Sequence, residues 1–263
     1  MLVRSGDAEI HYEILGSGPE VVLLHPFPAT RNVWRPVAVA LSARYRMILP
    51  DLRGHGDSGT GEGPATMAKH AQDLARVCDD AGVGKAVFAG NSIGGYILLE
   101  CWRQWRERIR GLVLCDTKAQ ADTAEGRATR LKSVDEVRKN GSAGFVENNL
   151  QKLLGASTRD NRPDIVDTAR KMMQRATVEG IAAVQQGMAE RPDSVATLAT
   201  IDVPALVVVG DEDVVTPPGD AELMQRSIRG SELRRIAKAG HYAPLEQAEA
   251  VTAAMREFLS RIR

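Results

Sequence analysis

A serine lies between two glycines in the segment GNSIG at residues 90–94, which has the pattern G-x-S-x-G. An apolar run precedes this segment and an apolar stretch follows it, so the sequence predicts a strand, a tight turn and a helix. In such a turn, side chains two residues before and after the serine would clash, which accounts for Gly90 and Gly94. A plain helix N-cap would explain the serine but would not require both glycines. We therefore interpret Ser92 as a candidate nucleophile.

A serine hydroxyl needs a neighbouring base that a third group orients. His241 lies in the segment AGHYAP at residues 239–244, after the last predicted strand, and so follows Ser92 in the order expected for a strand–serine–helix turn. We interpret His241 as the candidate general base. The other histidines lie in a predicted hairpin, at the end of a buried strand, in a glycine-rich loop and in a helix: His11, His25, His55 and His70.

The orienting carboxylate should follow a late strand and precede the histidine. The segment GDED at residues 210–213 offers three carboxylates directly after an apolar run. We choose Asp213, because Pro217 and Pro218 would order the loop that follows it and start the next helix. Asp211 stays open as the alternative, and Glu212 is expected to lie in a solvated turn.

A developing oxyanion needs preorganised hydrogen-bond donors. The N–H of Ile93, the residue after the candidate nucleophile, is the first expected donor. The second should come from the HPFP loop at residues 25–28, where the prolines carry no N–H; this leaves His25 and Phe27, of which we choose Phe27. His25 is then expected to hold the loop, and the Phe27–Pro28 bond is a candidate for the cis form.

Short apolar runs alternate with longer amphipathic stretches, which predicts an α/β fold with a mostly parallel twisted sheet and helices on both faces. The first segment, residues 2–15, is expected to form an antiparallel hairpin, and residues 233–236 a weak edge strand. The expected buried strands are 21–24, 47–49, 86–89, 112–114 and 205–209. The expected helices are 33–43, 66–82, 94–107, 218–228 and 246–261.

This alternation stops over residues 118–198, which show helical periodicity and no clear strand. We expect a helical cap of about four helices there, punctuated by Gly141, Gly155, Pro163, Gly180 and Pro192. The domain prediction is therefore an α/β core in two parts, residues 1–117 and 199–263, with the cap inserted between them.

The amino-acid composition limits the classes of binding partner that we expect. With 34 basic and 34 acidic residues the formal net charge is zero, so no overall field favours nucleic acid or an anionic membrane. The basic and aromatic segment at residues 102–110 is better explained as a helix C-terminus than as a nucleic-acid patch. Three cysteines without a CxxC pair, and no signal-peptide pattern at the start, lead us to expect a cytoplasmic protein without disulfides.

These motifs, in this order, resemble the α/β-hydrolase superfamily. The resemblance covers nearly the whole chain and includes the HPFP loop, the DLRGHGDS segment at residues 51–58, the serine turn, GDED and the His241 loop. Within the superfamily the chain is similar to small bacterial carboxylesterases and to 3-oxoadipate enol-lactonase-like serine hydrolases. The family loop usually has glycine where this chain has Pro26, a change that spares the N–H of Phe27. Ser92 in place of an aspartate counts against the dehalogenase and epoxide hydrolase branches.

The residues and the resemblance together predict a serine hydrolase that cleaves a small-molecule carboxylic ester or lactone through an acyl-enzyme. The expected catalytic residues are Ser92, Asp213 and His241, with Phe27 and Ile93 as the oxyanion hole. We expect no metal or organic cofactor. The same residues could serve C–C bond hydrolysis, lyase chemistry or acyl transfer, and a hydrolase-like small-molecule binding protein could keep them without turnover. Substrate identity, cap helix boundaries and oligomeric state are left open.

Overall fold

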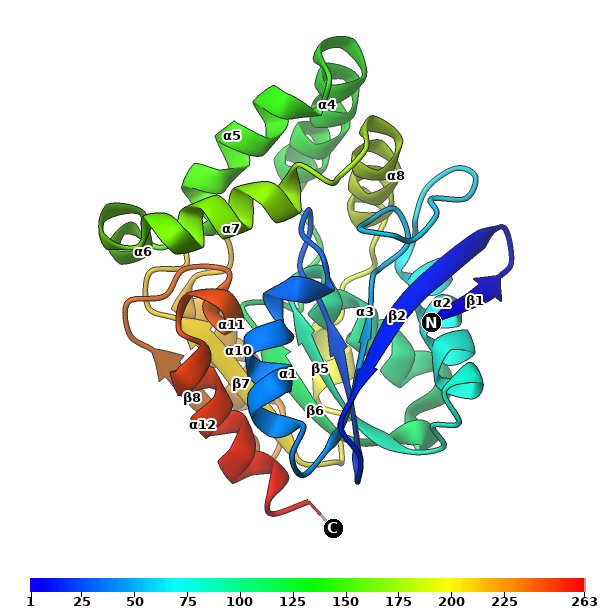
Figure 1. The fold of residues 1–263 in the computed structure, drawn as a ribbon, viewed down its shortest axis with the longest axis vertical. Helices are drawn as coiled ribbons and strands as arrows, with labels where there is room; N and C mark the ends of the chain where they lie inside the picture. Colours follow the sequence, from blue (N-terminus) through cyan, green and yellow to red (C-terminus); the bar gives the residue numbers. More distant parts are fainter. Residues whose placement is uncertain (263) are drawn as a thin grey trace.

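An eight-stranded sheet organises the protein, whose computed structural model describes residues 1–262 (Figure 1). The strand order is β1-β2-β4-β3-β5-β6-β7-β8, with antiparallel pairing at β1–β2 and β2–β4 and parallel pairing elsewhere. The strands are β1 (Leu2–Ser5), β2 (Ala8–Leu15), β3 (Glu20–Leu24), β4 (Arg46–Pro50), β5 (Ala86–Asn91), β6 (Ile109–Cys115), β7 (Ala205–Gly210) and β8 (Glu232–Ile236).

The predicted sheet is confirmed, including the N-terminal hairpin and the edge position of β8. The buried strands β3, β5, β6 and β7 are apolar on both faces, because helices cover the sheet on each side. Outside residues 116–204 the helices are α1 (Arg35–Leu41), α2 (Met67–Asp80), α3 (Ile93–Trp105), α10 (Pro218–Ser227), α11 (Ala243–Glu246) and α12 (Ala248–Leu259), with short 3-10 turns at Arg31–Val33 and Arg106–Arg108.

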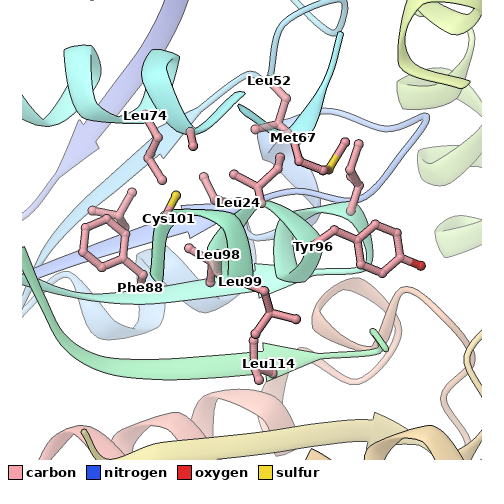
Figure 2. Packing of buried hydrophobic residues seen from close by; sticks show 14 of the residues in the cluster. Leu24, Leu52, Met67, Leu74, Phe88, Tyr96, Leu98, Leu99, Cys101 and Leu114 are labelled. Atoms are coloured by element: carbon pink, nitrogen blue, oxygen red, sulfur yellow. The ribbon is translucent and has the colours of Figure 1, made fainter. Parts of the chain in front are cut away.

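Two hydrophobic clusters pack these helices on the sheet. On one face α2 and α3 cover the central strands, and Figure 2 shows Leu98 and Cys101 of α3 near Phe88 of β5 and Leu74 of α2. On the other face α1 and α12 pack together, with Val37, Met255 and Phe258 among their buried residues. These layers fix the start of α3, and therefore the turn that carries Ser92.

Between β6 and β7 the chain forms six helices rather than the four predicted: α4 (Ala124–Asn140), α5 (Ser142–Leu153), α6 (Ala156–Asn161), α7 (Pro163–Met173), α8 (Val178–Ala189) and α9 (Val195–Leu198). The miscount arises because α6 and α9 are too short to show a helical period in the sequence. Gly180 does not break a helix either, since it lies in the first turn of α8. We call residues 118–198 the insertion; its helices α4–α8 lie beyond one end of the sheet strands (Figure 1).

Candidate active site

Ser92 lies in a strained turn between β5 and α3. Its backbone has φ 57° and ψ −116°, a conformation that residues with a side chain rarely adopt. A Cβ on Gly90 would lie 2.4 Å from the carbonyl carbon of Gly94, and a Cβ on Gly94 would lie 2.6 Å from the backbone oxygen of Leu24. Both glycines are therefore required by the tight turn. The Ser92 side chain makes no capping bond to α3, so the N-cap interpretation fails.

The hydroxyl of Ser92 points instead to His241. The Ser92 Oγ lies 2.7 Å from Nε2 of His241, and Nδ1 of the same ring lies 2.8 Å from Oδ2 of Asp213. Asp211 faces away and binds the Arg235 guanidinium at 2.6 Å. Of the two aspartates that the sequence left open, Asp213 is the one that contacts the histidine.

Asp213 is held by donors from its own loop. Its Oδ1 accepts hydrogen bonds from the N–H groups of Val215 and Thr216 at 2.8 and 3.0 Å, and its Oδ2 accepts one from the Thr216 hydroxyl at 2.7 Å. Burial alone would raise the pKa of Asp213, but its interaction with His241 and these bonds outweigh burial and hold the pKa below the ordinary value. The carboxylate is therefore ionised at neutral pH.

An ionised Asp213 fixes the tautomer of His241. The ring donates its Nδ1–H to the carboxylate, which leaves Nε2 free to accept the proton of the Ser92 hydroxyl. Serine, imidazole and carboxylate in this order can perform general-base-assisted nucleophilic attack. All three side chains are buried, Ser92 being 7% exposed.

The proposed oxyanion donors lie on two different elements. Ile93 is the first residue of α3, so its N–H has no partner within the helix. In residues 1–262 the N–H of Phe27 donates to no backbone oxygen, and the Phe27–Pro28 bond is cis, as predicted. The Phe27 ring packs edge-on against Phe145 of α5, 5.8 Å between centroids, which brings the insertion onto this loop.

His25 holds the same loop in place, as the sequence predicted. Its Nδ1 lies 2.9 Å from the backbone oxygen of Pro26, and its Nε2 accepts the N–H of Leu52 at 2.8 Å. Burial lowers the pKa of His25 to about 4, so the ring is neutral and keeps both bonds at neutral pH. It takes no part in the Ser92 network.

Two buried polar residues near this network were not predicted. Asn91 donates through Nδ2 to the backbone oxygen of His241 at 3.0 Å, and so ties β5 to the histidine loop. Asp116, at the end of β6, accepts the N–H of Gly210 at 2.8 Å and that of Ala243 at 3.2 Å. Burial and the nearby Asp213 charge raise the pKa of Asp116 well above its ordinary value. A polar residue at the carboxyl end of a buried strand was the signal that could have found Asp116.

Two glutamates bind the insertion to the loops of His241 and Asp213. Glu246 accepts the N–H groups of Gly240, Tyr242 and, from the insertion, Gly155. Glu212 accepts the N–H of Ser157 at 2.8 Å and also its hydroxyl. Glu212 lies in a turn, as expected, but it is half-buried and bonded to the insertion rather than freely solvated.

The N–H of His241 itself donates to the backbone oxygen of Leu153 in the insertion at 3.0 Å. Close packing accompanies these bonds, since a Cβ on Gly240 would lie 2.2 Å from the nitrogen of Gly155. We call residues 153–157, with the acceptors Glu212 and Glu246, the insertion seam. His241 and Asp213 thus lie on loops that the insertion helps to hold.

The model of the α/β hydrolase fold family matches residues 19–248, which is most of the chain. The chain belongs to the α/β-hydrolase family. The resemblance inferred from the motifs is therefore confirmed, as is the fold class.

Three relatives of this α/β hydrolase have names that state a hydrolytic activity. A thermophilic esterase from Thermogutta terrifontis is 41% identical, with a TM-score of 0.95 over 97% of this chain and 94% of that one. The 3-oxoadipate enol-lactonase 1 of Acinetobacter baylyi is 26% identical over 89% of this chain and 85% of its own length. RutD of Azorhizobium caulinodans, a protein named as a carbamate hydrolase, is 41% identical over 119 residues, and this match spans about half of each chain, 45%. The α/β hydrolase described here is thus similar to proteins named as an esterase, an enol-lactonase and a carbamate hydrolase.

Residues 1–262 of this hydrolase contain neither a candidate metal site nor a candidate membrane-spanning helix. No group of three or more histidine, cysteine, aspartate or glutamate side chains in that range is arranged to hold a metal ion. None of the described helices is both long and apolar enough to cross a membrane.

Proposed function

We propose that Ser92, His241 and Asp213 form a catalytic triad that cleaves a small-molecule carboxylic ester or lactone through an acyl-enzyme. The observation that carries the proposal is the continuous hydrogen-bond path from the Ser92 hydroxyl through both nitrogens of His241 to Asp213, with distances of 2.7 and 2.8 Å. The strained backbone of Ser92 supports it, because strain at a buried hydroxyl is typical of a nucleophile and not of a cap.

In the first half-reaction, the Ser92 Oγ attacks the carbonyl carbon while Nε2 of His241 takes the hydroxyl proton. The carbonyl oxygen becomes an oxyanion, which the N–H groups of Phe27 and Ile93 stabilise. The tetrahedral intermediate then breaks its bond to the alcohol oxygen, and the imidazolium gives this oxygen the proton. Asp213 stabilises the imidazolium throughout and does not itself take a proton.

In the second half-reaction, water attacks the acyl carbon and gives a proton to Nε2 of His241. The bond to the Ser92 Oγ breaks, Oγ recovers the proton, and the carboxylic acid leaves. A lactone follows the same steps, with its alcohol and acid ends on one product molecule. Apart from the attacking water, these steps use only groups of the chain and the substrate.

We propose that the insertion, residues 118–198, serves as a cap that selects the acyl or lactone part of the substrate. Phe145 of α5, which packs against Phe27, supports this role, since Phe27 carries one of the two proposed oxyanion donors. We also propose a cytoplasmic location, because Cys78, Cys101 and Cys115 are free and buried, as expected for a reducing compartment.

Steady-state hydrolysis of a chromogenic ester and lactone series tests the chemistry, with wild type beside Ser92→Ala. A phosphonate that labels active serines, read by intact mass, runs in parallel. We expect turnover and one adduct for wild type and neither for Ser92→Ala. Labelling of Ser92 without any turnover of esters or lactones would contradict the substrate class and direct the search to C–C substrates. Absence of both would remove the triad proposal and favour a binding protein.

A further inference from the structure

A hollow of about 580 Å³ opens where the insertion meets the core, and residues of α7 and α1 line it. Figure 1 shows α7 passing over the N-terminal end of α1, which is the end that follows the 3-10 turn at Arg31–Val33. A volume of this size is within the range of about 300–1,000 Å³ that small-molecule sites occupy. The lining contains none of the five residues proposed for catalysis.

The floor of the hollow is apolar. Pro36 and Val39 of α1 contribute from the core, Met172 of α7 from the insertion, and Leu245 from α11. Val39 is 56% exposed, which makes it one of the few large hydrophobic side chains on the described surface. Met172 and Leu245 are buried in the cluster that also contains Tyr242, the neighbour of His241, so the floor is held in place from beneath.

The charged residues that line the hollow are all cationic: Arg35, Lys171 and Arg175. Arg35 binds Glu13 and Arg175 binds Asp57, and neither of these acids lines the hollow. Lys171 forms no ion pair within residues 1–262. A cationic rim over an apolar floor favours a ligand that carries a negative charge at one end of an apolar chain.

We propose that this hollow is a second, non-catalytic binding site for an apolar carboxylate. The chain of the ligand would lie on Val39, Met172 and Leu245, and its carboxylate would pair with Lys171. The carboxylic acid released from an ester has this chemistry, so a hydrolase of esters meets such ligands. Because α1 belongs to the core and α7 to the insertion, one bound molecule would contact both parts.

Calorimetric titration with decanoate tests the proposal, using wild-type enzyme whose Ser92 has first been labelled by a long-chain phosphonate that fills the active site. We expect one decanoate to bind per chain, and decanol, which lacks the charge, to bind more weakly. Lys171→Glu should weaken decanoate binding about five- to tenfold by replacing attraction with repulsion. Val39→Asp, at an exposed position on the floor, should weaken it similarly.

The matched control is Lys152→Glu, which makes the same change at an exposed lysine of α5 outside the hollow and should stay within about twofold of wild type. Loss of decanoate binding on phosphonate labelling would overturn the proposal, since decanoate would then occupy the active site. Equal affinities of the Lys171→Glu and Lys152→Glu variants would overturn it as well. If Ser92 resisted the phosphonate, the proposed catalysis would fail, but the comparison of these two variants would still decide the hollow.

Discussion

At the scale of single residues, Asp213 and Asp211 share one loop but have different partners, His241 and Arg235. Asp213→Asn should lower kcat/KM about 10³- to 10⁴-fold, because the amide can donate to Nδ1 and so stabilises the wrong tautomer of His241. Asp211→Asn should stay within about twofold, since it removes only an exposed ion pair. Ester hydrolysis and the rate of Ser92 phosphonylation measure both. If Asp211→Asn lost its rate while Asp213→Asn kept the wild-type rate, Asp211 and not Asp213 would be the carboxylate that orients His241.

The cysteines give a prediction that is independent of catalysis. Burial raises the pKa of Cys78 to about 12 and those of Cys101 and Cys115 well above the ordinary thiol value. Because the thiolate is the reactive form, the folded protein should resist iodoacetamide at pH 8, whereas the urea-unfolded chain should gain three adducts by intact mass. Rapid labelling of the folded protein would show that at least one thiol is more accessible than its burial indicates.

At the scale of elements, the sequence predicted the parts that local patterns determine. The strands β3 and β5 are apolar along their length, and the glycines of the GNSIG turn make it tight. Each of these features is visible within a few neighbouring residues of the sequence. The insertion was predicted less well, because helices such as the six-residue α6 have no clear period and depend on tertiary packing.

The insertion seam, which contacts the loops of His241 and Asp213, could not be predicted from the sequence for a related reason. Glu212 and Ser157 are 55 residues apart, and Glu246 and Gly155 are 91 apart. A charged residue that follows a strand is most often solvated, so only the fold shows that these glutamates have buried or half-buried partners. The contacts of His241 with Ser92 and Asp213 agree with the order of the motifs in the sequence, but the bonds that hold the loops of these residues could not be predicted from it.

This seam leads to a prediction for Glu212. Glu212→Ala removes the acceptor of both Ser157 donors and frees the loop that carries Asp213. We expect the rate of Ser92 phosphonylation to fall about three- to tenfold, which corresponds to the net value of about 1 kcal/mol for one or two hydrogen bonds. Glu212→Gln, which keeps one acceptor, should recover part of the rate.

Asp211→Ala is the matched control, because it removes a neighbouring carboxylate that has no contact with the insertion. Phosphonylation is the chosen measurement because it reports the reactivity of Ser92 without requiring the natural substrate. Equal rates in Glu212→Ala and Asp211→Ala, with equal thermal stability, would show that the seam does not affect the triad.

At the scale of the whole molecule, buried histidines link stability to pH. The pKa of His25 is lowered to about 4 and that of His55 to about 3, in both cases chiefly by burial, and that of His70 is also well below the ordinary value. An unfolded histidine has a pKa of about 6.5, so unfolding takes up protons below that pH. Each neutral buried histidine therefore makes folding less favourable as the pH falls from about 6.5 towards its native pKa.

His70 allows this effect to be isolated, because neither of its ring nitrogens has a hydrogen-bond partner within residues 1–262. His70→Leu removes a buried polar ring without breaking a hydrogen bond. The free energy of unfolding at pH 7.5 should therefore change by no more than about 1 kcal/mol. At pH 5 the variant should be more stable than wild type by about 2 kcal/mol relative to that baseline, since its unfolded state no longer gains this proton.

Urea unfolding of wild type and His70→Leu at several pH values, followed by circular dichroism, measures the difference. Asp116 and Glu246 have raised pKa values and act in the opposite direction. A carboxyl that is neutral when buried makes folding less favourable as the pH rises, because the unfolded state ionises first. Their contributions are the same in both proteins and cancel in the difference, so the comparison reports the proton of residue 70. A difference in stability that stays constant from pH 7.5 to 5 would mean that His70 does not stay neutral when the protein is folded.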